Sequence, residues 1–135
     1  TPEYPEWKLI SAEAAILDQL GQQAEARRLY RRALDMQPGE PTILSNLGMS
    51  YVLEGDLKAA ENHLRQAAQA PGADSRVRQN LALVVGLQGR FKEAEEIASR
   101  ELSPQQAQAN MAYLRSMLSQ QNAWSDLRKE DRNTN

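Results

Sequence analysis

The sequence contains no cysteine and only one histidine, His63. A chain without cysteine folds without disulfides, but this leaves its compartment undecided, because secreted and cytosolic helical proteins can both lack them. A metal site needs several ligands that converge on one point, so a single histidine predicts no metal centre. We therefore interpret His63 as a surface or packing residue and expect no cofactor.

Other features that would indicate a particular class are also missing. No apolar run approaches the length of a membrane-spanning helix. A formal net charge of -2 provides no general attraction for nucleic acid or for an anionic membrane, since both favour strongly basic chains. No glycine-rich phosphate loop and no Ser/His/acid or Cys/His set is present. These absences argue against an enzyme and against general attraction of the whole chain to nucleic acid, and they leave a local basic patch open.

The chain instead repeats a pattern of small and apolar residues every 34 positions. The stretch from Asn46 to Tyr51 anchors the pattern. Five sets of three residues carry the pattern, and the members of each set lie 34 positions apart in the chain. The sets are Ala14, Gly48 and Ala82; Leu17, Tyr51 and Val85; Gly21, Gly55 and Gly89; Ala26, Ala60 and Ala94; and Tyr30, Leu64 and Ala98. A unit of this length and pattern resembles the tetratricopeptide repeat (TPR). The resemblance covers three units, 7–40, 41–74 and 75–108.

Each unit is expected to fold as two antiparallel helices, because a glycine lies midway between two stretches whose apolar residues recur at three- and four-residue steps. Small residues such as Gly48 and Ala60 would let the two helices approach closely. The resemblance implies an all-α fold, a right-handed superhelix of three TPR helix pairs. Glu13 occupies the place of Leu47 and Leu81, which predicts an open end of the stack there or missing upstream material.

A further helix is predicted after the third unit. Ser103, Pro104 and Gln106 form a capping-box signature. Behind it, an apolar stripe follows at steps of four, three and four, made of Ala107, Met111, Leu114 and Leu118. We expect a C-terminal capping helix over 104–121 that covers the last face of the stack. Residues 1–6 are predicted to be an extended lead-in and residues 122–135 a polar tail.

The resemblance also implies a concave groove, lined by the first helix of each unit, where TPR proteins bind peptides or helices. The predicted groove residues are Thr42, Ser45, Met49, Val52, Leu53, Arg76, Gln79, Leu83, Gly86 and Leu87, with Lys8, Ser11, Ala15, Asp18 and Gln19 from the first unit. Five of them, Met49, Val52, Leu53, Leu83 and Leu87, exceed what packing within a unit requires. Either the end helix of the chain or an amphipathic helix of a partner should cover these side chains.

A finer resemblance involves the third unit and the end helix. It is carried by Ala70-Pro-Gly-Ala-Asp-Ser-Arg-Val-Arg-Gln-Asn-Leu-Ala-Leu-Val84, Gly86-Leu-Gln-Gly-Arg-Phe-Lys-Glu-Ala-Glu95 and Gln108-Ala-Asn-Met-Ala-Tyr-Leu-Arg-Ser-Met-Leu-Ser119. These stretches are similar to the TadD family, TPR lipoproteins of the tight-adherence (Flp) pilus assembly system of bacteria. The similarity implies an outer-membrane lipoprotein facing the periplasm that acts as a pilotin-like factor for the pilus secretin. It also implies an upstream lipidated cysteine, which this sequence does not contain.

Three other interpretations remain open. The first is a self-associating scaffold, in which the end helix of one copy fills the groove of another and forms a homodimer. The second is a general TPR adaptor that binds peptides. The third is a binder of acidic ligands or nucleic acid through four arginines of one helix, Arg27, Arg28, Arg31 and Arg32. A solvated helix face explains these arginines more simply.

Overall fold

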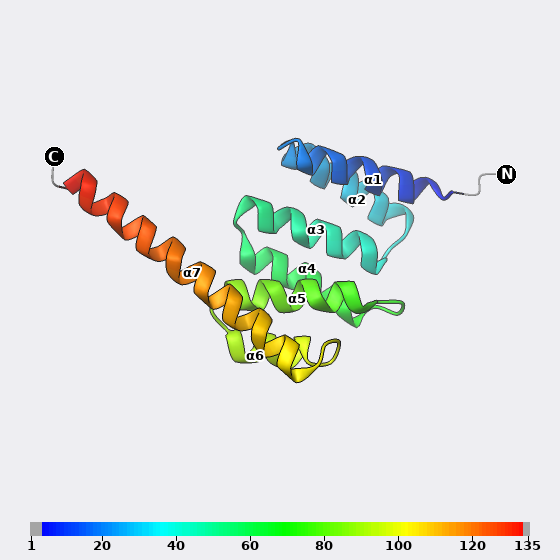
Figure 1. The fold of residues 1–135 in the computed structure, drawn as a ribbon. Helices are drawn as coiled ribbons and strands as arrows, with labels where there is room; N and C mark the ends of the chain where they lie inside the picture. Colours follow the sequence, from blue (N-terminus) through cyan, green and yellow to red (C-terminus); the bar gives the residue numbers. More distant parts are fainter. Residues whose placement is uncertain (1–3, 134–135) are drawn as a thin grey trace.

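The structure is a computed structural model of the 135-residue chain. It describes the backbone of residues 4–133 and the side chains of residues 4–120. The helices are α1 (Glu6–Gln19), α2 (Gln23–Met36), α3 (Pro41–Glu54), α4 (Leu57–Gln69), α5 (Ser75–Leu87), α6 (Phe91–Ala98) and α7 (Pro104–Asn133). The first six helices form three pairs, α1 with α2, α3 with α4 and α5 with α6. Figure 1 shows these antiparallel pairs stacked in a curved array and followed by α7. The predicted all-α fold of three pairs and a C-terminal helix is confirmed.

The turn inside each helix pair is made by the glycine that the repeat places there. Gly21, Gly55 and Gly89 have φ angles of 81°, 91° and 90°. These values lie in the left-handed region, which glycine enters without a steric penalty and other residues avoid. The repeated glycines therefore end the first helix of each unit, as predicted.

Gly48 allows the two helices of the middle unit to pack closely. A Cβ atom at this position would lie 2.9 Å from Cγ of Leu64 and 3.1 Å from the carbonyl oxygen of Ala60. Ala60 and Leu64 are both fully buried. In the outer units the residues at the positions of Gly48 and Ala60 are Ala14 with Ala26 and Ala82 with Ala94, all 2% exposed or less. Small side chains at these positions allow the backbones to approach, as predicted.

A buried polar group joins the first two units. The hydroxyl of Ser50 on α3 donates a hydrogen bond of 2.8 Å to the carboxylate of Asp18 on α1. Tyr30 also hydrogen-bonds to Asp18, and burial together with the nearby carboxylate raises the pKa of Tyr30. Asp18 is only 8% exposed. Its expected place in the groove is therefore wrong, because the side chain faces the interior of the stack.

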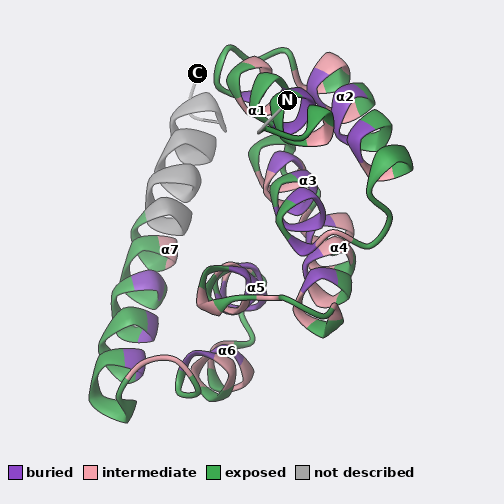
Figure 2. Cartoon of the chain, turned by 90° about the vertical axis from the view of Figure 1, so that its right-hand side faces the viewer, coloured by how far each residue is buried: buried purple, intermediate pink, exposed green. Residues whose placement is uncertain are grey.

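Helix α7 begins with the predicted cap, since the backbone N–H of Gln106 donates a 3.1 Å hydrogen bond to the hydroxyl of Ser103. It packs against α5 and α6, as α5 packs against α3 and α4. Figure 2 shows that the buried residues of α7 lie on the side that faces α5 and α6. The helix continues to Asn133, beyond the predicted end at 121. The side chains of the predicted tail 122–135 and the first three residues of the lead-in lie outside the described residues.

His63 has a packing role. Its ring stacks on Tyr51 with 5.2 Å between centroids, and Nδ1 lies 2.8 Å from the carbonyl oxygen of Ala59. Among the described residues, no group of three or more His, Asp or Glu side chains is arranged to hold a metal ion. Within the same part of the chain, none of the helices combines the length and the apolar character needed to cross a membrane.

Candidate partner-binding groove

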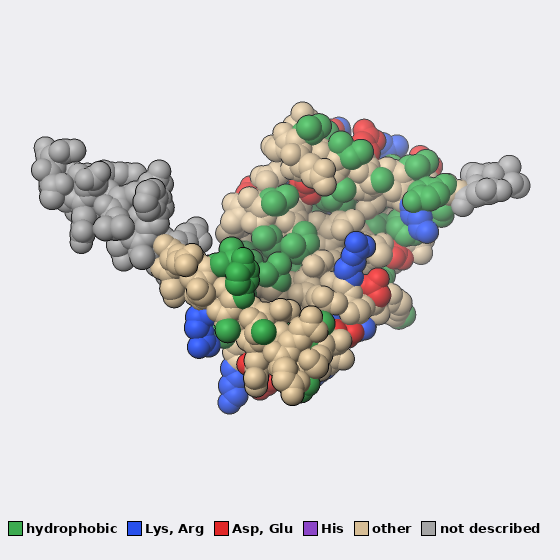
Figure 3. All heavy atoms as spheres, in the orientation of Figure 1, with side chains coloured by type: hydrophobic (Ala, Val, Ile, Leu, Met, Phe, Trp, Pro, Cys, Tyr) green, Lys and Arg blue, Asp and Glu red, His purple; other side chains and the backbone are tan. Residues whose placement is uncertain are grey.

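The main candidate site is an apolar hollow between α5 and α7, with a volume of about 440 Å³. Its floor and one wall come from α5, which contributes Gln79, Ala82, Leu83 and Leu87. The facing wall comes from α7, which contributes Asn110, Met111, Tyr113, Leu114 and Met117. Ala98 and Leu102 close one end. Figure 3 shows apolar side chains gathered where α7 meets the stack.

Three of the predicted groove residues lie in this hollow. Gln79, Leu83 and Leu87 follow one another at steps of four on α5, so they share a helix face. Leu83 keeps 36% of its surface exposed, while Leu87 is half-buried against the core of the second and third units. The α5 part of the groove thus lies beside an open hollow.

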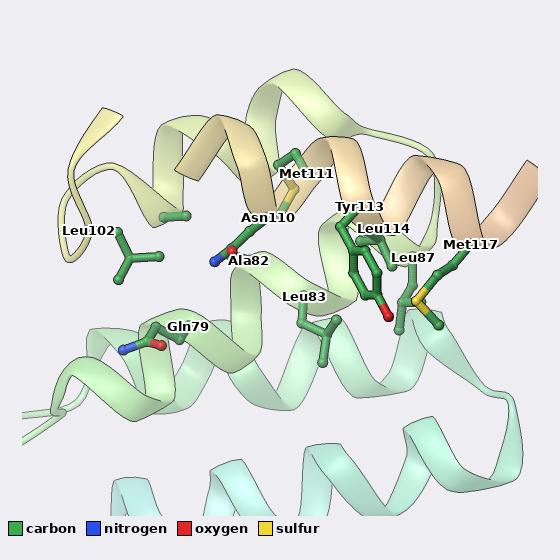
Figure 4. A pocket seen from close by; sticks show the side chains of 11 residues that line it. Gln79, Ala82, Leu83, Leu87, Leu102, Asn110, Met111, Tyr113, Leu114 and Met117 are labelled. Atoms are coloured by element: carbon green, nitrogen blue, oxygen red, sulfur yellow. The ribbon is translucent and has the colours of Figure 1, made fainter. Parts of the chain in front are cut away.

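The α7 wall includes two exposed residues that are not among the predicted groove residues. Tyr113 is 69% exposed and Met117 is 49% exposed. Figure 4 shows both side chains reaching from α7 toward Leu83 and Leu87 on α5. They lie four residues apart, immediately before Leu114 and Leu118 of the capping stripe. Tyr113 and Met117 thus form a second apolar stripe on α7, beside the stripe that packs on the stack. This second stripe is the feature of the sequence that indicates that α7 also lines a hollow.

A smaller polar pocket of about 270 Å³ contains three other predicted residues, Thr42, Ser45 and Arg76. It lies between the N-terminal halves of α3 and α5. Ser45 as a residue is 5% exposed. Its hydroxyl accepts a hydrogen bond of 3.2 Å from the side-chain amide of Asn80. Ser45 therefore joins two units, and only Thr42 and Arg76 of this set are exposed.

The remaining predicted groove residues are divided between the core and the surface. Met49 and Val52 are half-buried and pack against the core cluster of the second and third units. Leu53, at the end of α3, is 60% exposed. Gly86 lies beneath α7, since a Cβ at this position would be 2.7 Å from Cδ2 of Leu114. The end helix therefore covers part of the predicted groove and leaves the rest open.

The first unit contributes little to the hollow. Of its predicted groove residues, Ser11 is buried, like Asp18, whereas Ala15 is half-buried and Gln19 is exposed. The ammonium group of Lys8 lies over the rings of Tyr4 and Trp7, 5.7 and 5.5 Å from their centroids. The structure gathers apolar groove residues mainly at α5 and α7.

Three of the four arginines of α2 have partners within the chain. Arg27 forms an ion pair of 2.9 Å with Glu54, and Arg28 pairs with Glu25. Arg31 donates a hydrogen bond of 3.1 Å to the hydroxyl of Tyr51. These contacts favour a solvated helix face over a binding patch for acidic ligands.

Stacked helix pairs with a hollow on one side define a helical repeat protein. The sequence model of the tetratricopeptide repeat family matches residues 17–84, about half of the chain. The chain therefore belongs to the tetratricopeptide repeat family, whose fold serves as a scaffold for protein–protein interaction. This family assignment confirms the coarser of the two resemblances found in the sequence.

A solved structure supports the same architecture. The chain is similar to the crystal structure of the Sgt2 TPR domain from Aspergillus fumigatus, with a TM-score of 0.69 and 20% sequence identity. The similarity covers 89% of this chain and 83% of that one. At this identity the likeness concerns the fold alone. A search of curated proteins found no match.

Proposed function

We propose that this chain is a non-enzymatic interaction module that binds an apolar, helix-forming segment of a partner protein in the hollow between α5 and α7. One observation carries the proposal: Leu83, Tyr113 and Met117 are exposed around one hollow and come from two facing helices. Fully burying an apolar side chain contributes about 1.5–3 kcal/mol. An amphipathic helix laid into the hollow would gain this contribution at several positions.

Two amides at one end of the hollow would orient the bound segment. Gln79 on α5 and Asn110 on α7 both line this end, near Leu102 (Figure 4). A side-chain amide donates and accepts hydrogen bonds, so it can satisfy a polar group at the end of an apolar segment. Apolar residues would then provide the affinity, while the amides would select the direction of the bound helix.

We further propose that the partner is the secretin of the tight-adherence pilus system. Support comes from the location of the resemblance to the TadD family, because the resembling stretches contribute most of α5, α6 and the described part of α7. These are the helices that build the hollow. In this proposal the chain acts at the periplasmic face of the outer membrane, anchored through an upstream lipidated cysteine, and shields an apolar secretin segment until the secretin inserts.

The self-associating scaffold predicts that α7 fills the groove of a second copy. In the structure, α7 packs on α5 and α6 of its own chain, with Leu114 above Gly86. Sedimentation of the chain separates the two functions. A concentration-dependent dimer that disappears when residues after Ser103 are deleted would favour self-association, and a monomer at all concentrations would favour capture of a different protein.

The test of the proposed function is calorimetric titration with synthetic helical segments of the secretin. Leu83→Glu should weaken binding at least about tenfold, because a carboxylate buried in an apolar hollow without a partner costs several kcal/mol. Met36→Glu is the matched control, since Met36 is 41% exposed at the end of α2, away from the hollow. If Leu83→Glu and Met36→Glu bind the segment equally well and both keep the wild-type helicity, the hollow is not the binding site.

Leu53→Glu measures how far the groove extends. Leu53 is 60% exposed but lies on α3 and does not line the hollow. A loss of affinity comparable to that of Leu83→Glu would indicate one continuous groove across two units. Unchanged affinity would restrict the binding surface to α5 and α7.

A further inference from the structure

One pair of repeat positions has a different chemistry in the third unit. In the first two units the pair is apolar, and both of its members are buried in one cluster. These pairs are Ile10 with Ala33 and Leu44 with Ala67. The same positions of the third unit hold Arg78 and Glu101, which form a half-buried ion pair. An ion pair in place of an apolar contact adds little stability, so it indicates a role beyond packing.

The carboxylate of Glu101 is the acceptor of a small hydrogen-bond network. It accepts from Nε of Arg78 and from the hydroxyl of Ser75, both on α5. These bonds, with that of Arg78 contributing most, hold the pKa of the Glu101 carboxyl below its usual value of 4.5. Glu101 is therefore ionised at neutral pH. An ionised carboxylate accepts hydrogen bonds but has no proton to donate.

Ser75 connects this network to the hollow between α5 and α7. The hydroxyl of Ser75 has one proton, which it donates to Glu101, so toward any other group it can only accept. Nε2 of Gln79, one turn further along α5, donates a hydrogen bond of 2.8 Å to this hydroxyl oxygen. The charge of Glu101 thus determines that the nitrogen of the Gln79 amide faces Ser75.

The side-chain oxygen of Gln79 is left for a ligand. Gln79 is exposed and lines the hollow. Within the described part of the chain, the hydrogen bond to Ser75 is the one that its side-chain amide makes. Figure 4 shows the amide oxygen of Gln79 on the side of Leu83 and the amide nitrogen on the opposite side. Gln79 therefore presents an acceptor to the hollow.

We propose that Glu101 and Ser75 are positioning residues, which fix Gln79 as an acceptor and thereby place the N-terminal end of the bound partner helix beside it. This inference rests on the proposed function and adds the direction of the bound segment. The first backbone N–H groups of a helix have no partner within the helix, whereas its last turn leaves carbonyl oxygens unpaired. Gln79 accepts from such an N–H group. In a reversed segment, two oxygens would face each other.

The rest of the hollow is compatible with this direction. Asn110, the other amide at the same end, donates or accepts according to how its amide is turned. The opposite end is apolar and is lined by Leu87 and Met117. Gln79 and Leu87 lie eight residues apart on α5, which corresponds to about 12 Å, or about two turns of a bound helix. The two ends of the segment are therefore distinguishable.

Spin labels at either end of a synthetic helical segment of the secretin test the direction. The methyl signals of Leu102 and Met117 report on the two ends of the hollow. An N-terminal label should weaken the Leu102 signal more than the Met117 signal, and a C-terminal label should do the reverse. The opposite pattern, or equal weakening by each label, would overturn the proposal.

Substitutions of Ser75 separate positioning from folding. Ser75→Ala should weaken binding of the segment about two- to tenfold, because the Gln79 amide loses the group that orients it. Ser75→Thr retains the hydroxyl and should bind like wild type. Asp74 caps α5, so neither substitution removes the helix cap. Wild-type affinity of Ser75→Ala, or an equal loss in Ser75→Thr, would contradict the positioning role.

A double variant, Arg78→Leu with Glu101→Ala, gives the third unit the apolar pair of the second. It should keep the helicity and the unfolding temperature of wild type, because Leu44 and Ala67 support the same fold there. The hydroxyl of Ser75 is then free to donate to Gln79, so both orientations of the amide become possible. The two spin labels should now weaken both methyl signals equally. A retained preference for one direction would refute the role of Glu101.

The free chain provides a measurement that needs no partner. The side-chain amide proton signals of Gln79 should shift between wild type and the double variant, since the amide is held in one orientation only in wild type. Unchanged signals would refute the network itself. A segment that does not bind at all would contradict the proposed function, and with it the direction, while the Gln79 signals still report on the network. The two failures are therefore distinguishable.

Discussion

Gly86 on α5 lies directly beneath Leu114 on α7. A Cβ atom at Gly86 would lie 2.7 Å from Cδ2 of Leu114 and 3.4 Å from the sulfur of Met111. Both α7 side chains are 9% exposed or less, so they are fixed in place over the glycine. The missing side chain at Gly86 allows α7 to approach α5 closely at this point, and it thereby defines one wall of the hollow.

Gly86→Leu should therefore displace α7. The added side chain overpacks the contact, which we expect to cost about 1–3 kcal/mol in unfolding free energy. Hydrogen exchange should accelerate in α7 more than in α3, because α3 does not depend on this contact. Ala112→Leu is the control, since it adds similar bulk at an exposed position of α7 and should change stability by less than about 0.5 kcal/mol. Equal effects of the two substitutions would contradict the close approach.

The buried polar group of Asp18, Ser50 and Tyr30 should behave as a unit. Asp18→Val alone leaves two buried hydroxyls without their acceptor, which we expect to cost about 1–3 kcal/mol. The counterparts of the three residues in the next unit are apolar, namely Val52, Val84 and Leu64. The triple variant with these residue types should recover most of the loss, because no buried polar atom is then left unpaired. Urea unfolding that shows a larger loss in the triple variant would contradict this account.

Glu61 should make stability depend on pH in the acid range. Burial raises the pKa of its carboxyl, but hydrogen bonds from Arg65, Gln88 and Arg90 outweigh burial and lower the pKa below its usual value of 4.5. A lowered folded-state pKa stabilises the fold above the unfolded-state value, and this contribution is lost as pH falls through the folded-state pKa. Wild type should thus exceed Glu61→Gln in stability at pH 7.

The difference between wild type and Glu61→Gln should shrink as pH falls below about 4.5, where the wild-type carboxyl takes up a proton. The urea unfolding midpoints of both proteins at pH 7 and pH 3 measure this difference in stability. Glu96→Gln, an exposed position on α6, provides the control and should show a smaller difference at pH 7. A Glu61→Gln deficit that is the same at both pH values would show that the lost hydrogen bonds do not depend on the carboxylate charge.

The repeated positions made most of the helix pairs predictable. A residue such as Gly55 or Ala60 belongs to a pattern that occurs three times, and each occurrence supports the others. The repeat also identified the stripe of Gln79, Leu83 and Leu87. Periodicity is sufficient here because each unit packs on its neighbours in the same way.

The contacts of α7 could not be derived in the same way. This helix has no repeated counterpart, so the sequence indicated a stripe but not the surface beneath it. The repeat predicts Gly86 in the groove because its helix position matches that of Val52, whereas the structure places it under Leu114. Asp18 was misplaced for a related reason. The repeat predicts that this position faces the groove. In the first unit, however, the carboxylate of Asp18 is buried as the acceptor for Ser50 and Tyr30, and the later units have no such polar contact at this position.

The central claim is that α5 and α7 together form the binding surface for an apolar helix. Methyl NMR of the chain titrated with a secretin helix tests it most directly, because methionine and leucine methyl signals report contacts at single residues. The account predicts large shifts for Leu83, Leu87 and Met117, and none for Met36, which is exposed on α2. Shifts at Met36 with unchanged signals from Leu83 and Met117 would contradict the account.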